Sequence, residues 1–434
     1  MTHASGRRRG ATRATVAVPL LIGALALFLR VWAPGPTTQT TDERVWMIRS
    51  RVFNVAITHH DFDHATAWGA VPNLTDPTMP GVTTMWAGML GRNLARWGHE
   101  VGFNALPTTT SDGSPEVLRA GRAVVSVACS LALVVLVWLA ARLVGRRAAW
   151  TAGVLIAVEP WLVGNSGVLH TDAMVTMFGA VSLLAMAAAL APTDPPAPVA
   201  TATDRPARQV RRPALDVDIF LFVLSWGFGA LALLTKLNAF ALLGPGLVIV
   251  VLADAWQRGR AGTDRPSRLL GRALALGALW SFLAAVVFVA LWPAMWVSPL
   301  AQISHMRAAL HQLDGYHTQF FRGQADDDPG RLFYPFVLWF RLSPWLLICS
   351  VATFVALAAR PFARLAHRDR LAERLPAIPG WILLVTVPYL MAIYAAEKKL
   401  DRYILPALPF LAIISGVGVA ALVDAVSDRV GGRG

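Results

Sequence analysis

Cysteine is scarce in this sequence, which has 2 cysteines among 434 residues. Both of them, Cys129 and Cys349, lie inside long apolar runs. Two isolated thiols provide neither the paired set that a disulfide framework needs nor the closely spaced ligands of a thiolate metal site. They are interpreted as small apolar residues of a buried core.

Charged residues are few as well. They make up 15% of the chain, while hydrophobic residues make up 55% and the mean hydropathy is +0.51. Soluble domains carry about 25% charged residues, so this chain has too little polar surface for water. The composition is that of an integral membrane protein.

Lysine is nearly missing, although the formal net charge is +13. Lys236, Lys398 and Lys399 are the only lysines, so arginine supplies the positive charge. The arginines gather in alternate connections between the apolar runs, as in cytoplasmic loops. The charge is therefore interpreted as a topology signal and as attraction to anionic headgroups, which argues against nucleic-acid binding.

About ten apolar runs approach the roughly 20 residues that cross a bilayer core. They are Ala14–Trp32, Ala123–Ala141, Ala148–Gly164, Ala173–Ala191, Ile219–Thr235, Leu237–Leu252, Ala273–Trp292, Leu332–Ala359, Trp381–Ala396 and Tyr403–Val423. The third, fifth and sixth are short, and Pro245 is expected to bend the sixth, so each of these is also a candidate re-entrant segment. We predict an all-α polytopic membrane protein, in a single domain spanning residues 1–434.

The basic connections fix the expected orientation. Arginines cluster near the N-terminus and within 142–147, 205–212, 258–272 and 360–374, which places both termini in the cytoplasm. The first run is then an uncleaved helix. Residues 192–214 form a cytoplasmic linker, and the long outer loops are residues 33–118 and 293–331. Arginine and alanine richness suggests a GC-rich bacterium, so the expected location is a bacterial plasma membrane.

Charged residues inside the runs fall toward their outer ends, whereas a transporter places such groups near the midplane. This set comprises Arg30, Arg119, Arg122, Glu159, Lys236 and Arg341. Snorkelling to the headgroups is the alternative explanation for some of them. The first outer loop also carries one apolar helical face, expected in the membrane interface or packed on the protein's own surface: Met85, Trp86, Met89, Leu90, Leu94 and Trp97.

Several short motifs lie in the outer connections. The pair Asp42-Glu43 comes about ten residues after the first run, and Thr41 or Asp42 could simply cap a helix there. The same loop contains the run from Met79 to Trp86. Later connections contain His170-Thr171-Asp172 and Lys398-Lys399-Leu400-Asp401-Arg402-Tyr403.

In this order, the motifs resemble the GT-C glycosyltransferases, specifically the family 39 protein O-mannosyltransferase and aminoarabinose-transferase-like group. The resemblance runs from Asp42 through the last apolar run, and Asp42-Glu43 matches the group's acidic pair in position and type. Bacterial relatives often have His where this sequence has Met79. The resemblance implies GT-C-type outer loops and an inverting enzyme. Such an enzyme transfers a hexose or pentose from a polyprenyl-phosphate carrier to a protein, lipid or polysaccharide acceptor at the extracytoplasmic face.

This reaction needs a general base for the acceptor hydroxyl and cations for the departing phosphate. We assign the base to Asp42, with Glu43 as its helper or as the reserve choice. The expected phosphate ligands are Lys398, Lys399, Arg402 and Arg322, although each could be an ordinary surface cation. His170 and Asp172 are expected to bind substrate or form a second acidic site, with Asp172 as a helix cap the equal alternative.

Two clusters of polar residues make a divalent metal ion possible. The sequence predicts no cofactor with certainty. One is the stretch from His59 to His64, and the other is Asp326-Asp327-Asp328, but neither has a metal-specific spacing. No metal ligand is therefore assigned. The alternative function is a lipid or solute transporter or flippase, which would show paired broken helices in two halves. A noncatalytic scaffold would not need Asp42.

Overall fold

The computed structural model of the chain describes residues 2–32, 39–70, 80–101, 114–191, 217–260, 265–311, 318–365, 380–396 and 398–431. Its elements, with η for a 3-10 helix, are α1 (Thr2–Trp32), α2 (Thr41–Thr58), η1 (Phe62–His64), α3 (Val82–Glu100), α4 (Pro115–Leu143), α5 (Arg146–Val158), α6 (Pro160–Ser166), α7 (Asp172–Leu190), α8 (Ile219–Thr235), α9 (Ala239–Arg260), α10 (Pro266–Ala290), α11 (Ala294–Val297), α12 (Pro299–His311), β1 (Gln319–Phe321), β2 (Gln324–Asp326), α13 (Phe333–Arg341), α14 (Pro344–Leu365), α16 (Gly380–Ala395), η3 (Asp401–Ala407) and α17 (Leu408–Gly431).

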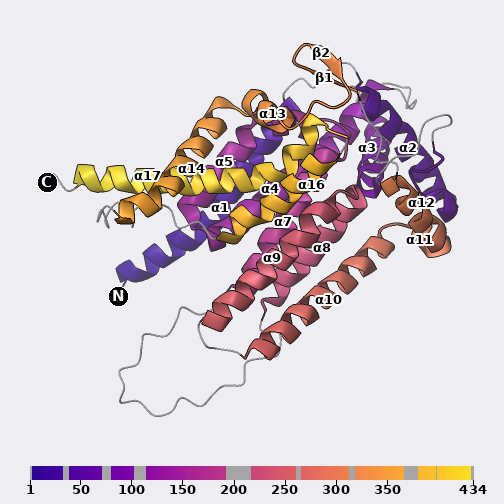
Figure 1. Cartoon of the computed structure of the whole chain (residues 1–434). Helices are drawn as coiled ribbons and strands as arrows, with labels where there is room; N and C mark the ends of the chain where they lie inside the picture. The colour runs from indigo at the N-terminus through magenta and orange to yellow at the C-terminus, as the bar shows by residue number, and fades with distance from the viewer. Residues whose placement is uncertain are drawn as a thin grey trace.

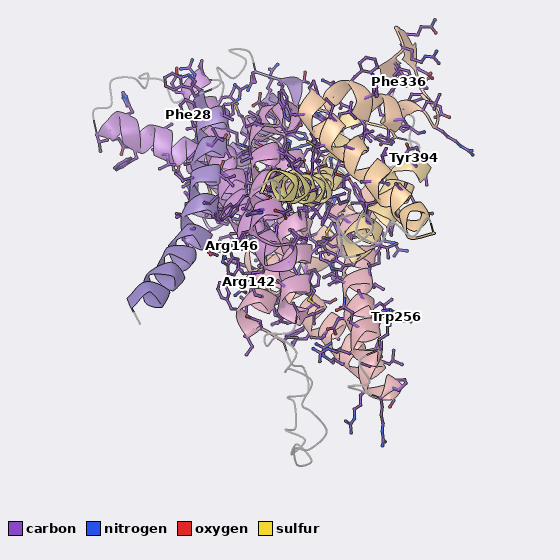
Figure 2. The ribbon with its side chains drawn as sticks, turned by 90° about the vertical axis from the view of Figure 1, so that its left-hand side faces the viewer. Phe28, Arg142, Arg146, Trp256, Phe336 and Tyr394 are labelled. Atoms are coloured by element: carbon purple, nitrogen blue, oxygen red, sulfur yellow. The ribbon has the colours of Figure 1, made fainter. Side chains whose placement is uncertain are left out.

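The long helices form a bundle with two different ends (Figure 1). One end, here called the capped end, carries α2, α3, α11, α12 and the β1–β2 hairpin, while both chain termini lie on the opposite side. Arg142 and Arg146 lie with Trp256 in the half away from Phe336 (Figure 2). The described basic connections therefore gather away from the capped end.

Within the described residues, 6 helical segments are long and apolar enough to cross a membrane. They are the apolar part of α1, then α4, α7, α9, α10 and the segment that joins η3 to α17. The helices α8, α14 and α16 are apolar but shorter. This confirms the expected all-α polytopic membrane protein. The proposed cytoplasmic linker, residues 192–214, lies outside the described residues.

Two predicted runs are wrong as single helices. The run Ala148–Gly164 divides into α5 and α6 at Glu159 and Pro160, because proline cannot continue a helix that precedes it. The run Leu332–Ala359 divides into α13 and α14 at Ser343. Ser343 donates from its backbone N and from Oγ to the Glu159 carboxylate, at 3.2 and 2.5 Å. The two breaks therefore satisfy each other's polar groups, as a low-dielectric setting requires.

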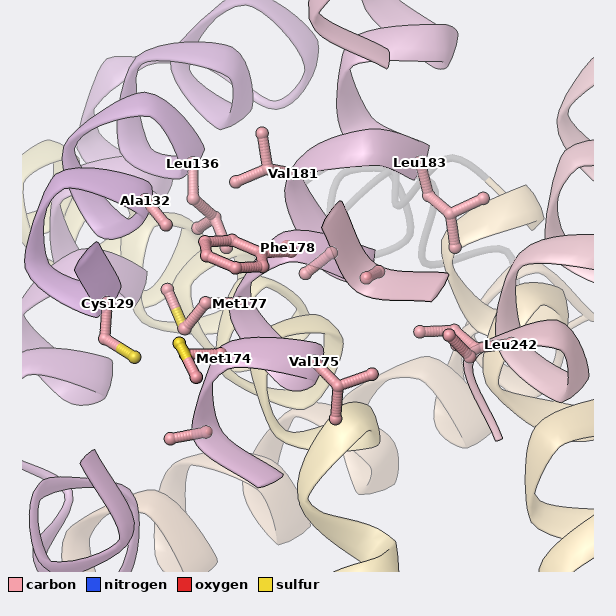
Figure 3. Packing of buried hydrophobic residues seen from close by; sticks show 14 of the residues in the cluster. Cys129, Ala132, Leu136, Met174, Val175, Met177, Phe178, Val181, Leu183 and Leu242 are labelled. Carbon is pink, nitrogen blue, oxygen red and sulfur yellow. The ribbon is translucent and has the colours of Figure 1, made fainter. Parts of the chain in front are cut away.

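Helix α7 is the centre of the bundle, and all of its residues are buried. Met174, Met177 and Phe178 face Ala132 and Leu136 of α4, as Figure 3 shows. Helices α8, α9 and α17 also contact α7. Since α7 begins at Asp172, this packing holds the start of the helix firmly at the capped end.

Helix α3 only partly matches the expected interfacial face. Met85 is fully buried, and Trp86 donates its indole N–H to the Leu291 carbonyl at 2.8 Å. The exposed apolar residues are Leu90, Leu94 and Trp97. The interfacial surface of α3 is therefore narrower than the sequence pattern predicts, because the first turn packs into the core.

A β-hairpin departs from the all-helical expectation. Strands β1 and β2 are antiparallel, and Phe321 pairs with Gln324. The two residues between them, Arg322 and Gly323, have φ angles of 52° and 84°. Two consecutive positive φ angles are those of a type I′ turn, whose twist matches that of a hairpin.

Helices α3 and α4 touch through glycine. A Cβ placed on Gly91 would lie 2.4 Å from the backbone N of Gly121. We therefore expect Gly91→Val to destabilise the fold by about 1–3 kcal/mol, because the helices would have to separate. Gly277→Val is the matched control, since nothing lies within 4 Å of a Cβ there. Equal falls in the thermal unfolding temperature of the two purified variants would contradict this close contact.

Candidate active site

Helix α2 begins with a capping box that fixes where Asp42 lies. Thr40 Oγ1 accepts from the Glu43 backbone N at 3.2 Å, and Glu43 Oε2 accepts from the Thr40 backbone N at 3.0 Å. Because Thr40 is the cap, Asp42 does not fill that role. The Asp42 side chain is 44% exposed and is available to other groups.

Glu43 is fully buried and has partners on both oxygens. Arg122 donates from Nε and Nη2 at 2.6 and 2.7 Å, and the Leu169 backbone N donates at 3.0 Å. Burial alone would raise the pKa of Glu43, but the hydrogen bonds from Arg122, Thr40 and Leu169 hold that pKa below its usual value. This carboxylate is therefore ionised and engaged, which suits a positioning group better than the expected helper base.

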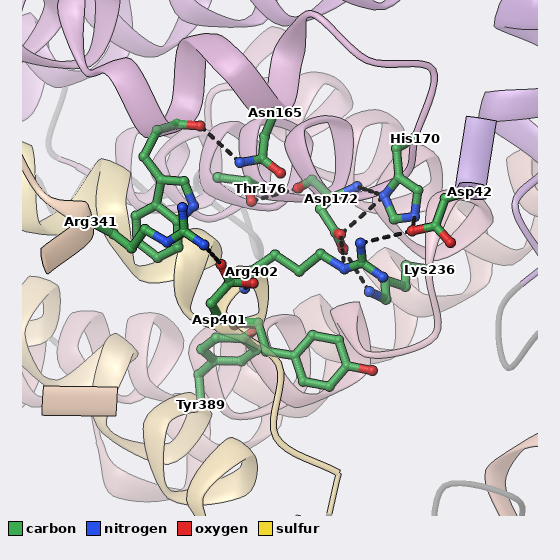
Figure 4. A network of polar contacts seen from close by, with 12 residues as sticks. Asp42, Asn165, His170, Asp172, Thr176, Lys236, Arg341, Tyr389, Asp401 and Arg402 are labelled. Carbon is green, nitrogen blue, oxygen red and sulfur yellow. Dashed lines mark hydrogen bonds and ion pairs between the residues drawn. The ribbon is translucent and has the colours of Figure 1, made fainter. Parts of the chain in front are cut away.

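Asp42, His170 and Asp172 form a line at the capped end (Figure 4). His170 Nε2 lies 3.4 Å from Asp42 Oδ2, and His170 Nδ1 lies 3.0 Å from Asp172 Oδ2. The imidazole thus has a carboxylate oxygen at each nitrogen, and Trp46 meets the ring edge-on at 6.5 Å. The structure brings these three predicted residues together, although they come from α2 and from the segment that enters α7.

Two cations complete this network. Arg402 Nη1 donates to Asp42 Oδ2 at 2.8 Å, and Arg402 Nε lies 3.1 Å from Asp172 Oδ2 without hydrogen-bond alignment. Lys236 Nζ donates to Asp172 Oδ1 at 2.6 Å and lies over the Tyr403 ring. Arg402 was expected to bind the donor phosphate, but in this structure it links the two carboxylates.

Lys398 gives the network an excess of positive charge. Burial and the neighbouring cations Lys236 and Arg402 lower the pKa of Lys398, while Asp42 opposes this effect. Three cations, Lys236, Lys398 and Arg402, thus accompany two carboxylates, Asp42 and Asp172. One positive charge is left uncompensated before His170 is counted.

The other two expected phosphate ligands are placed differently. Lys399 is buried and pairs with Asp328 at 2.9 Å, so its charge is already compensated. Arg322 is exposed at the hairpin turn, with its guanidinium 6.0 Å from the centre of the Phe336 ring. The ion pairs described above for Asp42 and Asp172 include neither Lys399 nor Arg322.

The residues of the acidic cluster, Asp326 to Asp328, do not converge on one point, and neither do those of the histidine-rich stretch from His59 to His64. Asp326 Oδ1 accepts from the Asp328 backbone N, and Asp328 Oδ1 accepts from the Gly330 backbone N, so these carboxylates stabilise a turn. His64 pairs with Asp61 on the surface. Across the described ranges, no group of three or more His, Cys, Asp or Glu residues is arranged to hold a metal ion.

Two important partners were not assigned from the sequence. Lys236 was noted as an outward charge, but its pairing with Asp172 was not foreseen, and neither was the pairing of Arg122 with Glu43. Each pair joins residues that lie 64 or 79 positions apart in the chain. The available signal was the rarity of lysine and the position of Lys236 at the end of an apolar run, whereas Arg122 lies inside α4.

Comparison with known proteins gives the fold but no family. No family model matches the chain, and no curated protein matches it. Among solved structures, the Archaeoglobus fulgidus oligosaccharyltransferase in the apo form has a TM-score of 0.50 and 13% identity, over 96% of this chain and 52% of that one. The same enzyme in complex with zinc and sulfate gives 0.50 and 13%, over 95% and 50%.

ArnT from Cupriavidus metallidurans, bound to undecaprenyl phosphate, has a TM-score of 0.47 and 17% identity. It is matched over 95% of this chain and 60% of its own length. The chain thus spans about half to three fifths of the structures it resembles. The likeness to the archaeal enzyme shows a shared helical membrane fold.

Proposed function

We propose that this protein is a membrane glycosyltransferase that moves a sugar from a polyprenyl-phosphate carrier to an acceptor at the extracytoplasmic face. The observation that carries the proposal is Asp42, a partly exposed carboxylate that Arg402 and His170 contact through Oδ2. Oδ1 is then left to accept a proton. A carboxylate oriented in this way beside surplus positive charge suits a base that works next to an anionic leaving group.

The proposed chemistry is a single displacement. The acceptor hydroxyl oxygen forms a bond to the anomeric carbon while Asp42 takes the hydroxyl proton. The bond from the anomeric carbon to the phosphate oxygen breaks, and the carrier phosphate keeps the electron pair. Because attack and departure occur on opposite faces, the anomeric configuration inverts. Lys398, together with the neighbouring cations Lys236 and Arg402, stabilises the charge that grows on the phosphate.

Three further observations support this proposal. The charged groups lie where helices begin or end at the capped end, rather than near mid-span. The described arginine-rich connections lie away from that end, which by the positive-inside rule supports an extracytoplasmic capped end. The fold is also that of a protein named as an oligosaccharyltransferase. More specifically, we propose that the protein belongs to the protein O-mannosyltransferase and aminoarabinose-transferase-like group.

The decisive test is transfer by the purified full chain in proteoliposomes. Radiolabelled polyprenyl-phosphate hexoses and pentoses would be supplied together with protein, lipid and glycan acceptors. We expect at least one donor to release its sugar with inversion, in a manner that depends on the protein. Failure to consume any donor of such a panel, by a protein whose fold is verified by its unfolding temperature, would rule out this function.

Lys398 should control donor affinity. We expect Lys398→Met to raise the KM for the lipid donor about tenfold, since one charge-assisted contact with phosphate is lost. Lys399→Met should have a smaller effect, because Lys399 pairs with Asp328. The pKa of Lys398 is lowered, so this lysine loses its proton at a pH below the usual lysine pKa of about 10.4. Because the neutral amine binds phosphate less well, the donor KM of the wild type should rise as the pH increases toward that value. Equal KM changes in the two variants would contradict the assignment.

A further inference from the structure

Three side chains at the capped end carry donor atoms of the kinds that bind a divalent metal ion. Asp42 and Asp172 supply carboxylate oxygens, and His170 supplies imidazole nitrogens, which are ligand types that zinc and manganese accept. The three side chains, here called the Asp–His–Asp trio, lie close together, with 3.4 Å from His170 Nε2 to Asp42 Oδ2 and 3.0 Å from His170 Nδ1 to Asp172 Oδ2. Whether the trio can hold an ion then depends on what already contacts its oxygens.

Both carboxylates of the trio face cations that belong to the chain itself. The Arg402 guanidinium reaches the two of them, since Nη1 donates to Asp42 Oδ2 at 2.8 Å and Nε lies 3.1 Å from Asp172 Oδ2 (Figure 4). The other oxygen of Asp172 accepts from Lys236 Nζ at 2.6 Å. A divalent ion that bridged Asp42 and Asp172 would therefore have to displace the guanidinium that already links them.

The position of the second cation, Lys236, is fixed by its surroundings. Lys236 is 4% exposed, and its Nζ lies 4.6 Å from the centre of the Tyr403 ring, on the residue that follows Arg402. A metal ion in the trio would be repelled by both cations, and repulsion between charges is stronger in a buried setting than in water. The trio therefore does not fit a divalent ion. This agrees with the finding that the described part of the chain contains no metal-binding group of three His, Cys, Asp or Glu residues.

We propose that Arg402, assisted by Lys236, takes the place of a divalent metal ion in the Asp–His–Asp trio, so that the intact protein binds no metal there. For its catalytic meaning, this inference rests on the proposed glycosyltransferase function. A guanidinium is always charged and presents several donors in a rigid plane, so it can hold two carboxylates in a fixed arrangement as a bridging ion does. The reaction at this site would then need no added metal.

Removal of the bridging cation tests the inference, because it should create a metal site. Binding of Mn²⁺ to the purified full chain in detergent is measured by electron paramagnetic resonance, and each protein is compared with the same protein carrying Asp172→Asn. This comparison counts only ions that depend on Asp172 and excludes ions held by the stretch from His59 to His64. We expect equal affinities for the wild type and its Asp172→Asn version. For Arg402→Ala, the Asp172→Asn version should bind Mn²⁺ about tenfold more weakly, or worse, since a ligand is lost.

The matched control is Arg341→Ala, because Arg341 lies at the same end of the bundle and forms its ion pair with Asp401 at 2.7 Å. This variant should behave like the wild type. Binding of Mn²⁺ by the wild type that depends on Asp172, or no such binding by Arg402→Ala, would overturn the proposal. An equal gain in the two arginine variants would show only a general loss of positive charge and would also overturn it. If Asp172→Asn lowers the unfolding temperature, His170→Gln replaces it in the comparison.

A chelator separates this inference from the function on which it rests. Where the protein transfers sugar, its rate should be the same with and without EDTA. A loss in EDTA that Mn²⁺ restores would overturn the replacement of a metal ion by Arg402 and leave the transferase function intact. Failure to consume any donor would reject the transferase function, while the Mn²⁺ titrations would still decide whether Arg402 occupies the place of an ion.

Discussion

Asp42→Asn should lower the rate of sugar transfer by about 10²- to 10⁴-fold, the usual contribution of a general base. Asparagine keeps the size of the side chain and an oxygen that can accept a hydrogen bond from Arg402, but it cannot take a proton at neutral pH. The variant should therefore fold normally and bind the lipid donor nearly as well. The measurement is kcat at saturating donor, together with the donor KM.

A matched control is Asp328→Asn, because Asp328 is an exposed carboxylate that pairs with Lys399 rather than with the Asp42 network. We expect its kcat to remain within a few-fold of the wild type. Retention of kcat within tenfold by Asp42→Asn would show that Asp42 is not the base. A large loss in both variants would instead indicate a general need for negative charge at the capped end.

Arg122→Ala should destabilise the protein by about 3–5 kcal/mol, the typical effect of removing one partner from a buried ion pair. Glu43 would keep its buried charge, while the Arg122 guanidinium that donates two hydrogen bonds to it would be gone. The measurement is unfolding in detergent or nanodiscs. The double variant Glu43→Leu/Arg122→Met should recover part of the loss, since it leaves no buried charge.

The pH dependence of stability distinguishes a positioning role of Glu43 from a catalytic one. The lowered pKa of Glu43 means that its stabilising contribution is present above its unfolded pKa, near 4.3, and is lost as pH falls through the folded value. Glu43→Gln should therefore lower the unfolding temperature at pH 7 and have less effect at low pH. A normal unfolding temperature with a strongly reduced kcat would instead make Glu43 a catalytic residue.

The sequence selected residues that the structure brings together, but it did not predict the contacts between them. Asp42, His170, Asp172 and Arg402 were all selected, because an acidic pair after the first helix and short polar motifs at outer helix ends are local signals. The contacts between them are not local. Arg402 lies 360 positions from Asp42, and no periodicity reports that it links two carboxylates.

The helix breaks show a similar limit. Apolar runs are found from composition, and most of the predicted runs correspond to helices. Glu159 and Ser343 interrupt two of these runs, and each break is stable because the other one supplies its polar partner. Such mutual satisfaction lies in the tertiary structure, so a hydropathy pattern cannot report it. The hairpin turn at Arg322 and Gly323 was missed because Arg is an unusual residue for positive φ.

The complete burial of α7 has a consequence for how the protein is made. A helix this apolar can enter the membrane surrounded by lipid, but its final neighbours include α4 before it and α17 near the end of the described chain. Enclosure of α7 is therefore finished only after α17 has been synthesised and inserted. A nascent chain that stops short of Leu408 would leave part of α7 facing lipid, and Arg402 would have no rigid support from which to hold Asp42 and Asp172. Assembly of the site is thus a late event in biogenesis.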